Sequence, residues 1–304
     1  SPPCPKAGVD MLTVTTGGAL RHALKRHRQA DESVAFVPTM GNLHAGHLEL
    51  VRRGRQLADV VVVSIFVNPL QFGASEDLDA YPRTLAADRE QLFAEGVQYL
   101  FTPDSDEMYP EGLAAHTVVR VPDLADTLCG SSRPGHFDGV ATVVSKLFNL
   151  VQPQYAIFGE KDFQQLSIIR KMVADLCIPI EVVGVATVRA EDGLALSSRN
   201  GYLSAAERRI APLLRKTLLE CRDAIACGFD NYLQLESHAR MQLLQSGFEP
   251  DYFAIRDART LRSVSDETEE VAILAAARLG RTRLIDNIRH SLNPAADWGM
   301  LAAR

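Results

Sequence analysis

Short runs of β-branched and aromatic residues alternate with stretches of helical spacing between residues 34 and 188. The runs are continuously apolar, which is typical of strands that are covered on both faces of a parallel sheet. They lie at Val34–Pro38, Val60–Val67, Tyr99–Phe101, Tyr155–Phe158 and Ile180–Val188. Strands that alternate with helices in this way predict the α/β class, with a Rossmann-like, doubly wound parallel sheet.

The stretches between these runs predict helices, and in the last of them, Phe163–Leu176, apolar residues recur every three or four positions. These helices are expected near Leu48–Ala58, Leu85–Glu95, Val140–Leu150 and Phe163–Leu176. Beyond about Arg189 the pattern changes to helical stretches at Ala205–Ala226 and Tyr232–Leu244, followed by short strands at Tyr252–Ile255, Val271–Ala276 and Arg283–Ile288. We therefore expect a Rossmann-like domain over residues 11–188 and a smaller C-terminal α+β domain over residues 189–304 that closes over the site.

Charge and composition exclude several classes of partner. The 304 residues carry 32 Lys and Arg against 38 Asp and Glu, a net charge of −6, which argues against a surface that neutralises nucleic-acid phosphates. The longest apolar run, Val60–Val67, is far shorter than the ~20 residues of a membrane-spanning helix. Cys4, Cys129, Cys177, Cys221 and Cys227 show neither metal-binding nor disulfide-scaffold spacing. The first ten residues lack the pattern of a signal peptide, so we expect a cytoplasmic protein.

The first cluster with a chemical meaning follows the strand at Val34–Pro38, where Pro38-Thr-Met-Gly-Asn-Leu-His44-Ala-Gly46-His47 leads into a helix. Ligands bind at such strand ends in open α/β sheets, and a helix N-terminus favours phosphate. Glycines allow the backbone to approach a ligand, and His44 and His47 stand on one side of the helix start. One histidine could instead cap the helix while the other is merely exposed. Two histidines that flank a glycine at this position favour a nucleotide-phosphate site.

Two further clusters could supply phosphate ligands. Gly159-Glu-Lys161-Asp162 joins a strand to a helix, with a mobile cation at Lys161 and a carboxylate at Asp162 that could cap the helix or accept from a ribose hydroxyl. Ser197-Ser198-Arg199-Asn200 offers hydroxyl and guanidinium donors to the outer phosphates of a nucleotide. Taken singly, each cluster also fits a solvated surface turn.

An early HxGH and a late Ser-rich basic loop together resemble the two signatures of the HIGH/KMSKS nucleotidyltransferase superfamily. Further motifs resemble, in order, those of the pantothenate synthetases, also called pantoate–β-alanine ligases. They are PTMGNLHAGH, FVNPLQFG at Phe66–Gly73, YPRT at Tyr81–Thr84, RPGHFDGV at Arg133–Val140, FGEKDFQQL at Phe158–Leu166 and SSRNGYL at Ser197–Leu203, with a family-like tail, AARLGRTRLIDNI, at Ala276–Ile288.

The resemblance implies ATP-dependent amide formation. In this family pantoate attacks the α-phosphorus of ATP, pyrophosphate leaves, and β-alanine attacks the pantoyl adenylate to give pantothenate and AMP. By resemblance, the catalytic contacts to the phosphates come from His44, His47, Lys161, Ser197, Ser198 and Arg199. The rest of the ATP pocket is assigned to Pro38, Thr39, Met40, Gly41, Gly159, Asp162 and Leu196.

The resemblance also assigns a pantoate pocket, a metal and an assembly. Pantoate is expected to contact Gln71 and Gln165, beside apolar neighbours Phe66, Val143 and Phe163, with Asn68 and Tyr81 supporting the same loop. Mg²⁺ is expected to accompany ATP, and Asp88 with Gln91 resembles a family metal position, although a surface pair one helical turn apart is equally natural. A homodimer is implied.

Two departures from the family pattern stand near these motifs. Leu196 replaces a methionine found in many relatives, an exchange of similar volume. Cys129 stands where relatives commonly have a glutamate, so any charged contact made by that glutamate is absent.

Among other functions, a different HxGH nucleotidyltransferase that transfers AMP or CMP to a phosphorylated small molecule is the main alternative, and FVNPLQFG and GEKDFQQL favour the ligase. A class I aminoacyl-tRNA synthetase is disfavoured because this acidic sequence shows no obvious RNA-binding domain. A non-catalytic nucleotide sensor is disfavoured because all the expected phosphate ligands are present in the sequence.

Overall fold

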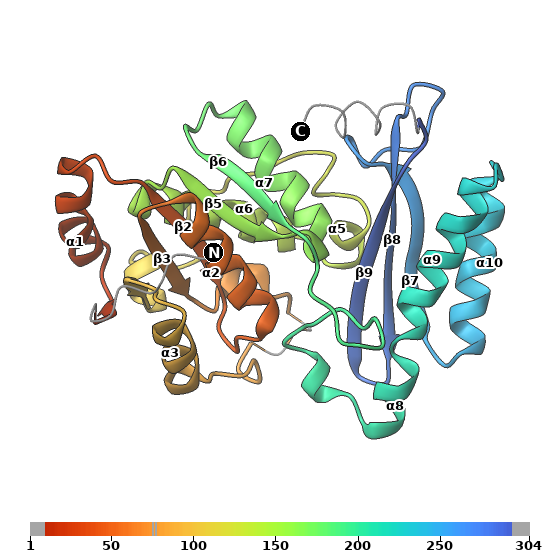
Figure 1. Cartoon of the computed structure of the whole chain (residues 1–304), viewed down its shortest axis with the longest axis horizontal. Coiled ribbons are helices and arrows are strands. Elements are labelled where there is room, and N and C mark those ends of the chain that lie inside the picture. Colours follow the sequence, from red (N-terminus) through yellow and green to blue (C-terminus); the bar gives the residue numbers. More distant parts are fainter. Residues whose placement is uncertain (1–9, 75, 77, 294–304) are drawn as a thin grey trace. The chain divides into compact units, whose positions relative to one another are not determined.

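The computed structural model of the chain describes residues 10–293, apart from 75 and 77 (Figure 1). Contacts between residues divide this part into two compact units. The first comprises residues 10–160 and 165–188, and the second residues 161–164 and 189–293. Lys161 and its three successors therefore group with the C-terminal unit, although they lie in sequence within the Rossmann-like region.

The first unit is built on a six-stranded sheet in which every neighbouring pair is parallel. Its order is β1-β4-β3-β2-β5-β6. The strands are β1 (Leu12–Val14), β2 (Val34–Thr39), β3 (Val60–Ile65), β4 (Tyr99–Phe101), β5 (Tyr155–Gly159) and β6 (Glu181–Val185). The direction of winding reverses beside β2, so the predicted doubly wound α/β fold is confirmed.

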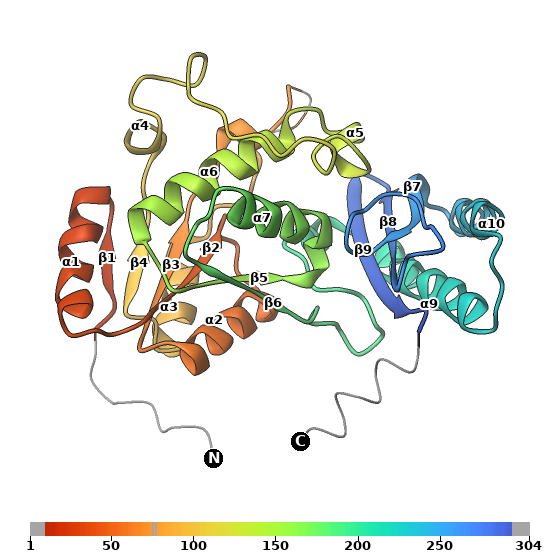
Figure 2. The same cartoon turned by 90° about the horizontal axis from the view of Figure 1, so that it is seen from above.

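Helices cover both faces of this sheet, with α2 and α3 on one side and α6 and α7 on the other (Figure 2). Their bounds are α1 (Gly17–Gln29), α2 (Ala45–Leu57), α3 (Leu85–Ala94), α4 (Ser105–Met108), α5 (Cys129–Ser132), α6 (His136–Val151) and α7 (Phe163–Asp175), with short 3-10 helices η1 (Pro69–Gln71) and η2 (Glu160–Asp162). This two-sided cover explains why β2 and β3 are mostly apolar, with the first four residues of each strand buried.

Strand β2 pairs with its two neighbours over very different lengths. Its pairing with β3 covers all six residues, whereas its pairing with β5 covers only Ala35 and Phe36. The β2–β5 ladder therefore ends before the carboxyl ends of these two strands. In doubly wound sheets, ligands bind at this reversal point, beyond the strand ends.

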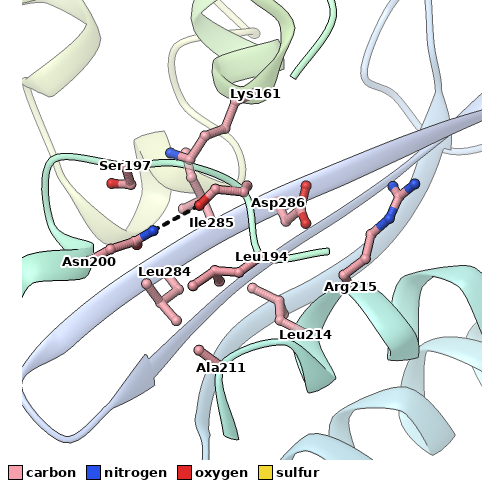
Figure 3. A pocket seen from close by; sticks show the side chains of 11 residues that line it. Lys161, Leu194, Ser197, Asn200, Ala211, Leu214, Arg215, Leu284, Ile285 and Asp286 are labelled. Atoms are coloured by element: carbon pink, nitrogen blue, oxygen red, sulfur yellow. Dashed lines mark hydrogen bonds between the residues drawn. The ribbon is translucent and has the colours of Figure 1, made fainter. Parts of the chain in front are cut away.

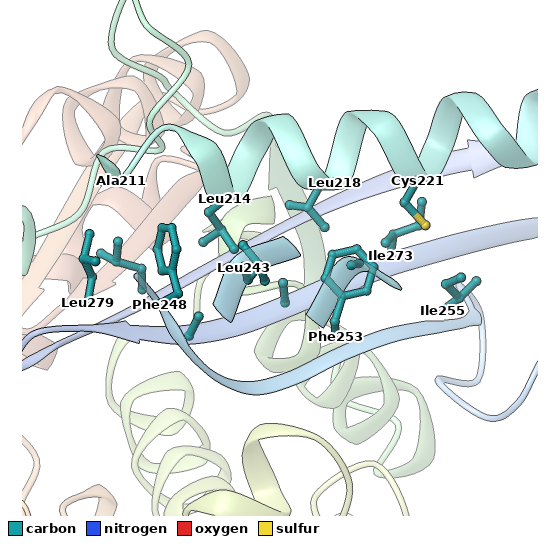
Figure 4. Packing of buried hydrophobic residues seen from close by; sticks show 14 of the residues in the cluster. Ala211, Leu214, Leu218, Cys221, Leu243, Phe248, Phe253, Ile255, Ile273 and Leu279 are labelled. Carbon is teal, nitrogen blue, oxygen red and sulfur yellow. The ribbon is translucent and has the colours of Figure 1, made fainter. Parts of the chain in front are cut away.

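The second unit contains a three-stranded antiparallel sheet, β7-β8-β9, covered by helices α9 and α10. Its elements are η3 (Asn200–Tyr202), α8 (Ala205–Ile210), α9 (Leu213–Ala226), α10 (Tyr232–Gln245), β7 (Glu249–Asp257), β8 (Glu270–Leu279) and β9 (Thr282–Ser291). Leu214, Leu218, Leu243, Phe248 and Ile273 meet in its core (Figure 4). The helical stretch predicted over Ala205–Ala226 consists of two helices, α8 and α9, which are separated at Pro212, a residue with no N–H to donate.

No helix in the described part of the chain is both long and apolar enough to cross a membrane. Cys129, Cys177, Cys221 and Cys227 are free thiols, and Cys4 lies outside the described residues.

The core of the second unit gives a prediction for stability. Leu218 on α9 is fully buried, so Leu218→Ala leaves a cavity and should lower the free energy of unfolding by about 2–5 kcal/mol. Leu244 on α10 is 57% exposed, and Leu244→Ala should change it by less than about 0.5 kcal/mol. Urea denaturation followed by circular dichroism measures both, and equal losses would contradict this account of the core.

Candidate active site

His44 and His47 together cap the N-terminus of α2. The Nδ1 atom of His44 accepts from the backbone N–H of Gly46 at 3.0 Å, and Nδ1 of His47 accepts from the N–H of His44 at 3.1 Å. Backbone N–H groups only donate, so in a neutral ring the proton of each imidazole resides on Nε2. Both histidines therefore cap the helix through Nδ1 and neither is exposed, which differs from the alternative in which one caps and the other is merely exposed.

Gly46 is what allows His44 to take this position. A Cβ at Gly46 would lie 2.6 Å from Cε1 and 2.8 Å from Nδ1 of His44, too close for any side chain. The two imidazole rings then lie side by side, with centroids 4.1 Å apart. The spacing HxGH thus follows from the capping geometry: the glycine makes room for one ring, and the residue after it supplies the second.

Asp88 holds the turn between β2 and the two histidines. Its carboxylate accepts from the backbone N–H groups of Asn42 at 2.9 Å and Leu43 at 3.0 Å, and from the hydroxyl of Thr84 at 3.1 Å. The Asp88 side chain is almost fully buried. Gly41 and Asn42 both have positive φ, a conformation that needs support outside glycine. Asp88 therefore fixes the backbone that leads to His44.

A buried polar chain occupies the loop after β3. The hydroxyl of Tyr109 donates to Oδ1 of Asn68 at 2.6 Å, and Nδ2 of Asn68 donates to Oε1 of Gln71 at 3.1 Å. Nε2 of Gln71 in turn points to Sδ of Met40, at 3.4 Å. Three residues expected at the ATP or pantoate pockets, Met40, Asn68 and Gln71, are thus brought together, and Tyr109 is a member that the sequence did not suggest.

Helix α6 supports this loop from one side. A Cβ at Gly139 would lie 2.5 Å from the carbonyl oxygen of Leu70, so only glycine permits this approach. Nδ1 of His136 donates to the carbonyl of Gln71 at 2.8 Å. Val143 is buried on the same helix. The motif RPGHFDGV therefore shapes the backbone of the Gln71 loop.

Aromatic contacts add to the same region. The ring of Phe66 lies 6.2 Å from that of Tyr109, and the ring of Tyr81 meets Phe72 edge-on at 5.9 Å. Tyr81 thus contacts the residue that follows Gln71, as expected for a residue that supports this loop.

Near Cys129, which replaces the glutamate of many relatives, Arg133 is paired with a different carboxylate. Cys129 is buried at the start of α5, and Arg133 donates to both carboxylate oxygens of Glu76, from Nε at 2.6 Å and from Nη2 at 2.8 Å. Burial alone would raise the pKa of Glu76, but hydrogen bonding and charge from Arg133 lower it below its usual value. Arg133 is therefore neutralised by Glu76, and no carboxylate at position 129 is required for this.

In the second unit, strand β9 holds the turn that carries Lys161. The side-chain amide of Asn287 donates to the carbonyl oxygen of Lys161 at 2.8 Å. The guanidinium of Arg289, two residues further along β9, lies 5.5 Å from the centre of the Phe163 ring. Asp162 is exposed. Backbone and ring contacts thus fix this segment.

The same strand holds the loop with Ser197, Ser198 and Arg199. Asp286 accepts from both terminal nitrogens of Arg189, Nη1 at 2.7 Å and Nη2 at 2.9 Å, and Arg189 begins the hairpin that precedes this loop. Within the loop, the hydroxyl of Ser197 accepts from the N–H of Arg199 at 3.1 Å, and Asn200 donates to the carbonyl of Ala195 at 3.0 Å. Adjacent residues of β9 therefore position both sets of predicted phosphate ligands in this unit.

A small pocket joins these segments (Figure 3). The side chains of Lys161, Ser197 and Asn200 lie on one side of it and Arg215 on the other. Desolvation and the nearby charge of Arg189 lower the pKa of Arg215. Its remaining lining residues are Leu194, Ala195, Ala211, Leu214, Leu284, Ile285 and Asp286. Lys161 and Ser197 supply an ammonium and a hydroxyl to the lining of this pocket, and both groups can donate to a phosphate.

Comparison with known proteins agrees with these motifs. The family model described as pantoate-beta-alanine ligase matches residues 12–289. The chain belongs to the pantoate–β-alanine ligase family. A pantothenate synthetase of Pseudomonas putida (strain W619) is 57% identical over 278 residues, covering 91% of this chain and 97% of that relative.

Solved structures of the family share the fold. Pantothenate synthetase from Thermus thermophilus matches with a TM-score of 0.85 at 51% identity, covering 91% of this chain and 99% of that one. The Francisella tularensis pantoate-beta-alanine ligase, solved with β,γ-ATP and β-alanine, matches with a TM-score of 0.77 at 31% identity, covering 92% and 97%.

Other expected site residues in this family member lie as follows. Pro38 and Thr39 end β2, Gly159 ends β5, and Gln91 lies on α3 one turn after Asp88. Gln165, on α7, is half-buried, and its side chain makes no hydrogen bond to a residue that the structure describes. That Gln165 and Gln71 face one another stays a prediction.

Asp286, Asn287 and Tyr109 were missed as candidates. A polar pair, Asp286-Asn287, between apolar positions of a strand was the available signal for two of them. Tyr109 has no comparable signal, because its partner lies 41 residues away in a different loop.

The Arg189–Asp286 pair yields a prediction for stability. Asp286 is 4% exposed, so Asp286→Asn leaves a guanidinium facing an amide NH₂ and should lower the free energy of unfolding by on the order of 3 kcal/mol. Asp192 also pairs with an arginine through two contacts, but at the surface, and Asp192→Asn should cost less than about 1 kcal/mol. Urea titration of both variants measures these losses. If Asp286→Asn left the free energy of unfolding unchanged, the Arg189–Asp286 pair would not be the anchor of the hairpin.

Proposed function

We propose that this chain joins pantoate to β-alanine to form pantothenate, with cleavage of ATP to AMP and pyrophosphate. Family membership over residues 12–289 is the observation that carries this function. In the first step a pantoate carboxylate oxygen attacks the α-phosphorus, and the bond to the β-phosphate oxygen breaks. In the second, the β-alanine amine attacks the acyl carbon of the pantoyl adenylate, loses a proton, and AMP leaves.

The phosphate ligands are proposed to act by charge and hydrogen bonding. Negative charge grows on the α-phosphoryl oxygens and on the leaving pyrophosphate, so fixed donors there stabilise the transition state. His44 and His47 can donate from Nε2, since their Nδ1 atoms cap α2. Lys161, Ser197, Ser198 and Arg199 supply the other donors. The adenosine part of ATP is assigned to Pro38, Thr39, Met40, Gly41, Gly159, Asp162 and Leu196.

Pantoate is assigned to the neutral amides of Gln71 and Gln165. Gln71 is supported by the buried polar chain through Asn68, and Phe66 and Val143 provide apolar neighbours in the first unit. Phe163 is proposed as a further apolar contact, and Tyr81 as a support of the loop. Amide donors can bind carboxylate and hydroxyl oxygens without neutralising the attacking carboxylate.

Magnesium is proposed to enter as the ATP complex, held mainly by phosphates and water, as Mg²⁺ usually is. Asp88 and Gln91 as its ligands stay a prediction. Three donors already engage the Asp88 carboxylate, and no cluster of three or more His, Cys, Asp or Glu side chains within the described residues could hold a metal. The donor set thus fits the support of a turn better than a resident ion.

A homodimer and a cytoplasmic location are further proposals that rest on the family resemblance and, for the location, on the free thiols. The alternative function, transfer of AMP or CMP to a phosphorylated small molecule, is favoured by no specific feature of this chain.

Isotope exchange tests the proposed chemistry. If the acyl adenylate forms before the amine reacts, pantoate alone should support exchange of labelled pyrophosphate into ATP. The complete mixture should yield AMP, pyrophosphate and pantothenate in equal amounts. Exchange that needs β-alanine would contradict this order of steps, and ADP as the nucleotide product would contradict adenylation.

A magnesium titration separates the two roles of Asp88. Asp88→Asn places an NH₂ group against donors of the turn, so the adenylation rate should fall about tenfold or more through displacement of the His44 turn. The Mg²⁺ concentration for half-maximal rate should stay within about twofold of the wild type. Gln91→Ala is measured in the same way, because Gln91 is the other residue expected to hold the metal. If excess Mg²⁺ restored the rate of Asp88→Asn, the carboxylate would be a metal ligand.

A further inference from the structure

The buried chain Tyr109–Asn68–Gln71 has a defined direction. Asn68 contacts two backbone groups whose roles are fixed: the carbonyl of Gly139, 3.0 Å away, can only accept, and the N–H of Leu70, 3.3 Å away, can only donate. The NH₂ group of Asn68 must therefore face Gly139, and its oxygen must face Leu70. The hydroxyl of Tyr109 meets that oxygen and so acts as a donor.

The orientation of Asn68 determines that of Gln71. The second hydrogen of the Asn68 NH₂ group points to Gln71, so the atom of Gln71 on that side must be its oxygen. The NH₂ group of Gln71 is thereby turned the other way, where its contact is Sδ of Met40 at 3.4 Å. Gln71 is 9% exposed, and a thioether is a weak acceptor. Among the described residues, this buried donor has only a weak partner, and it is well suited to an incoming oxygen.

We propose that Tyr109 and Asn68 are positioning residues that fix the Gln71 amide with its NH₂ group toward the substrate, so that the site selects an oxygen acceptor. This inference rests on the proposed role of Gln71 as a pantoate ligand. It adds that Gln71 cannot present its own oxygen, because that would set its NH₂ group against the NH₂ group of Asn68. A substrate group that can only donate is rejected at this position.

The surroundings of Tyr109 keep its hydroxyl a donor. Burial raises the pKa of Tyr109 well above its ordinary value. Its ring is packed between Phe66 and His116, and the Lys146 ammonium lies 4.8 Å from the ring centre. Tyr109 is therefore held in place by its ring, and its hydroxyl is available only for Asn68.

Removal of one hydroxyl tests the positioning role. Tyr109→Phe should weaken pantoate binding about tenfold and leave ATP binding within about twofold, both measured by calorimetry. In a Gln71→Ala background the same change should have less than a twofold effect, because Tyr109 acts through Gln71. Tyr99→Phe is the matched control: Tyr99, on β4, is equally buried at 3%, and its hydroxyl bonds to Arg26 and His27 on α1 and to none of Tyr109, Asn68 and Gln71.

The direction of the amide has its own test. Gln71→Glu replaces the outward NH₂ by an oxygen, so at mildly alkaline pH, where the new carboxyl is ionised, it should weaken pantoate binding at least tenfold more than Gln71→Ala does. If the Gln71 oxygen faced a pantoate hydroxyl instead, Gln71→Glu would bind as well as the wild type.

Each outcome has one meaning. Normal pantoate affinity in Tyr109→Phe, or an equal loss in the Gln71→Ala background, would overturn the positioning role. Pantoate binding by Gln71→Glu that matches or exceeds that of Gln71→Ala would overturn the direction. Normal pantoate affinity in Gln71→Ala would instead remove Gln71 from the pantoate site. Failure of the proposed reaction itself would appear separately, as absent pyrophosphate exchange in the wild type.

Discussion

The hydrogen bonds from the Asn42 and Leu43 backbone to Asp88 are the contacts on which the geometry of the first unit depends most. They stabilise two consecutive residues of positive φ, a turn that the chain would not adopt unsupported. The turn brings His44 to the start of α2, where the two imidazoles satisfy backbone donors of the helix. Support of the backbone by a buried carboxylate thus determines which nitrogen of each imidazole accepts from the backbone.

The second unit uses the same principle on a different scaffold. Asp286 and Asn287 are neighbours on β9, so their side chains leave the strand on opposite faces. One binds Arg189 and the other the carbonyl of Lys161. Two loops that are far apart in sequence are therefore fixed by one dipeptide. A strand is well suited to this task because its pleat is rigid and is paired along its whole length with β8.

The sequence predicted strands and helices well where burial and periodicity agree. It predicted poorly the contacts between residues that lie far apart in the sequence. The Val60 run and the Tyr99 run match β3 and β4 to within two residues. The helix expected from Leu48 begins at Ala45, since its first turn is polar and is stabilised by His44 capping instead of by an apolar stripe. Strand β1 and helix α1 were not predicted, and β1 has only three residues. Family motifs supplied the candidate site residues, whereas two of the partners of Asp88 are backbone groups 46 and 45 residues away, which no local pattern reveals.

The proposed ligands divide by charge in a way that the two-step reaction explains. Cationic donors are assigned to ATP phosphates, where negative charge increases in the transition state, so their interaction strengthens as the reaction proceeds. Pantoate is assigned to neutral amides. A cation bound to the pantoate carboxylate would stabilise it most before it attacks, when its charge is greatest, and would oppose the first step. A fixed amide NH₂ orients the carboxylate with a smaller ground-state preference. Precise orientation of the Gln71 amide by Asn68 and Tyr109 therefore matters more than the strength of the bond it makes.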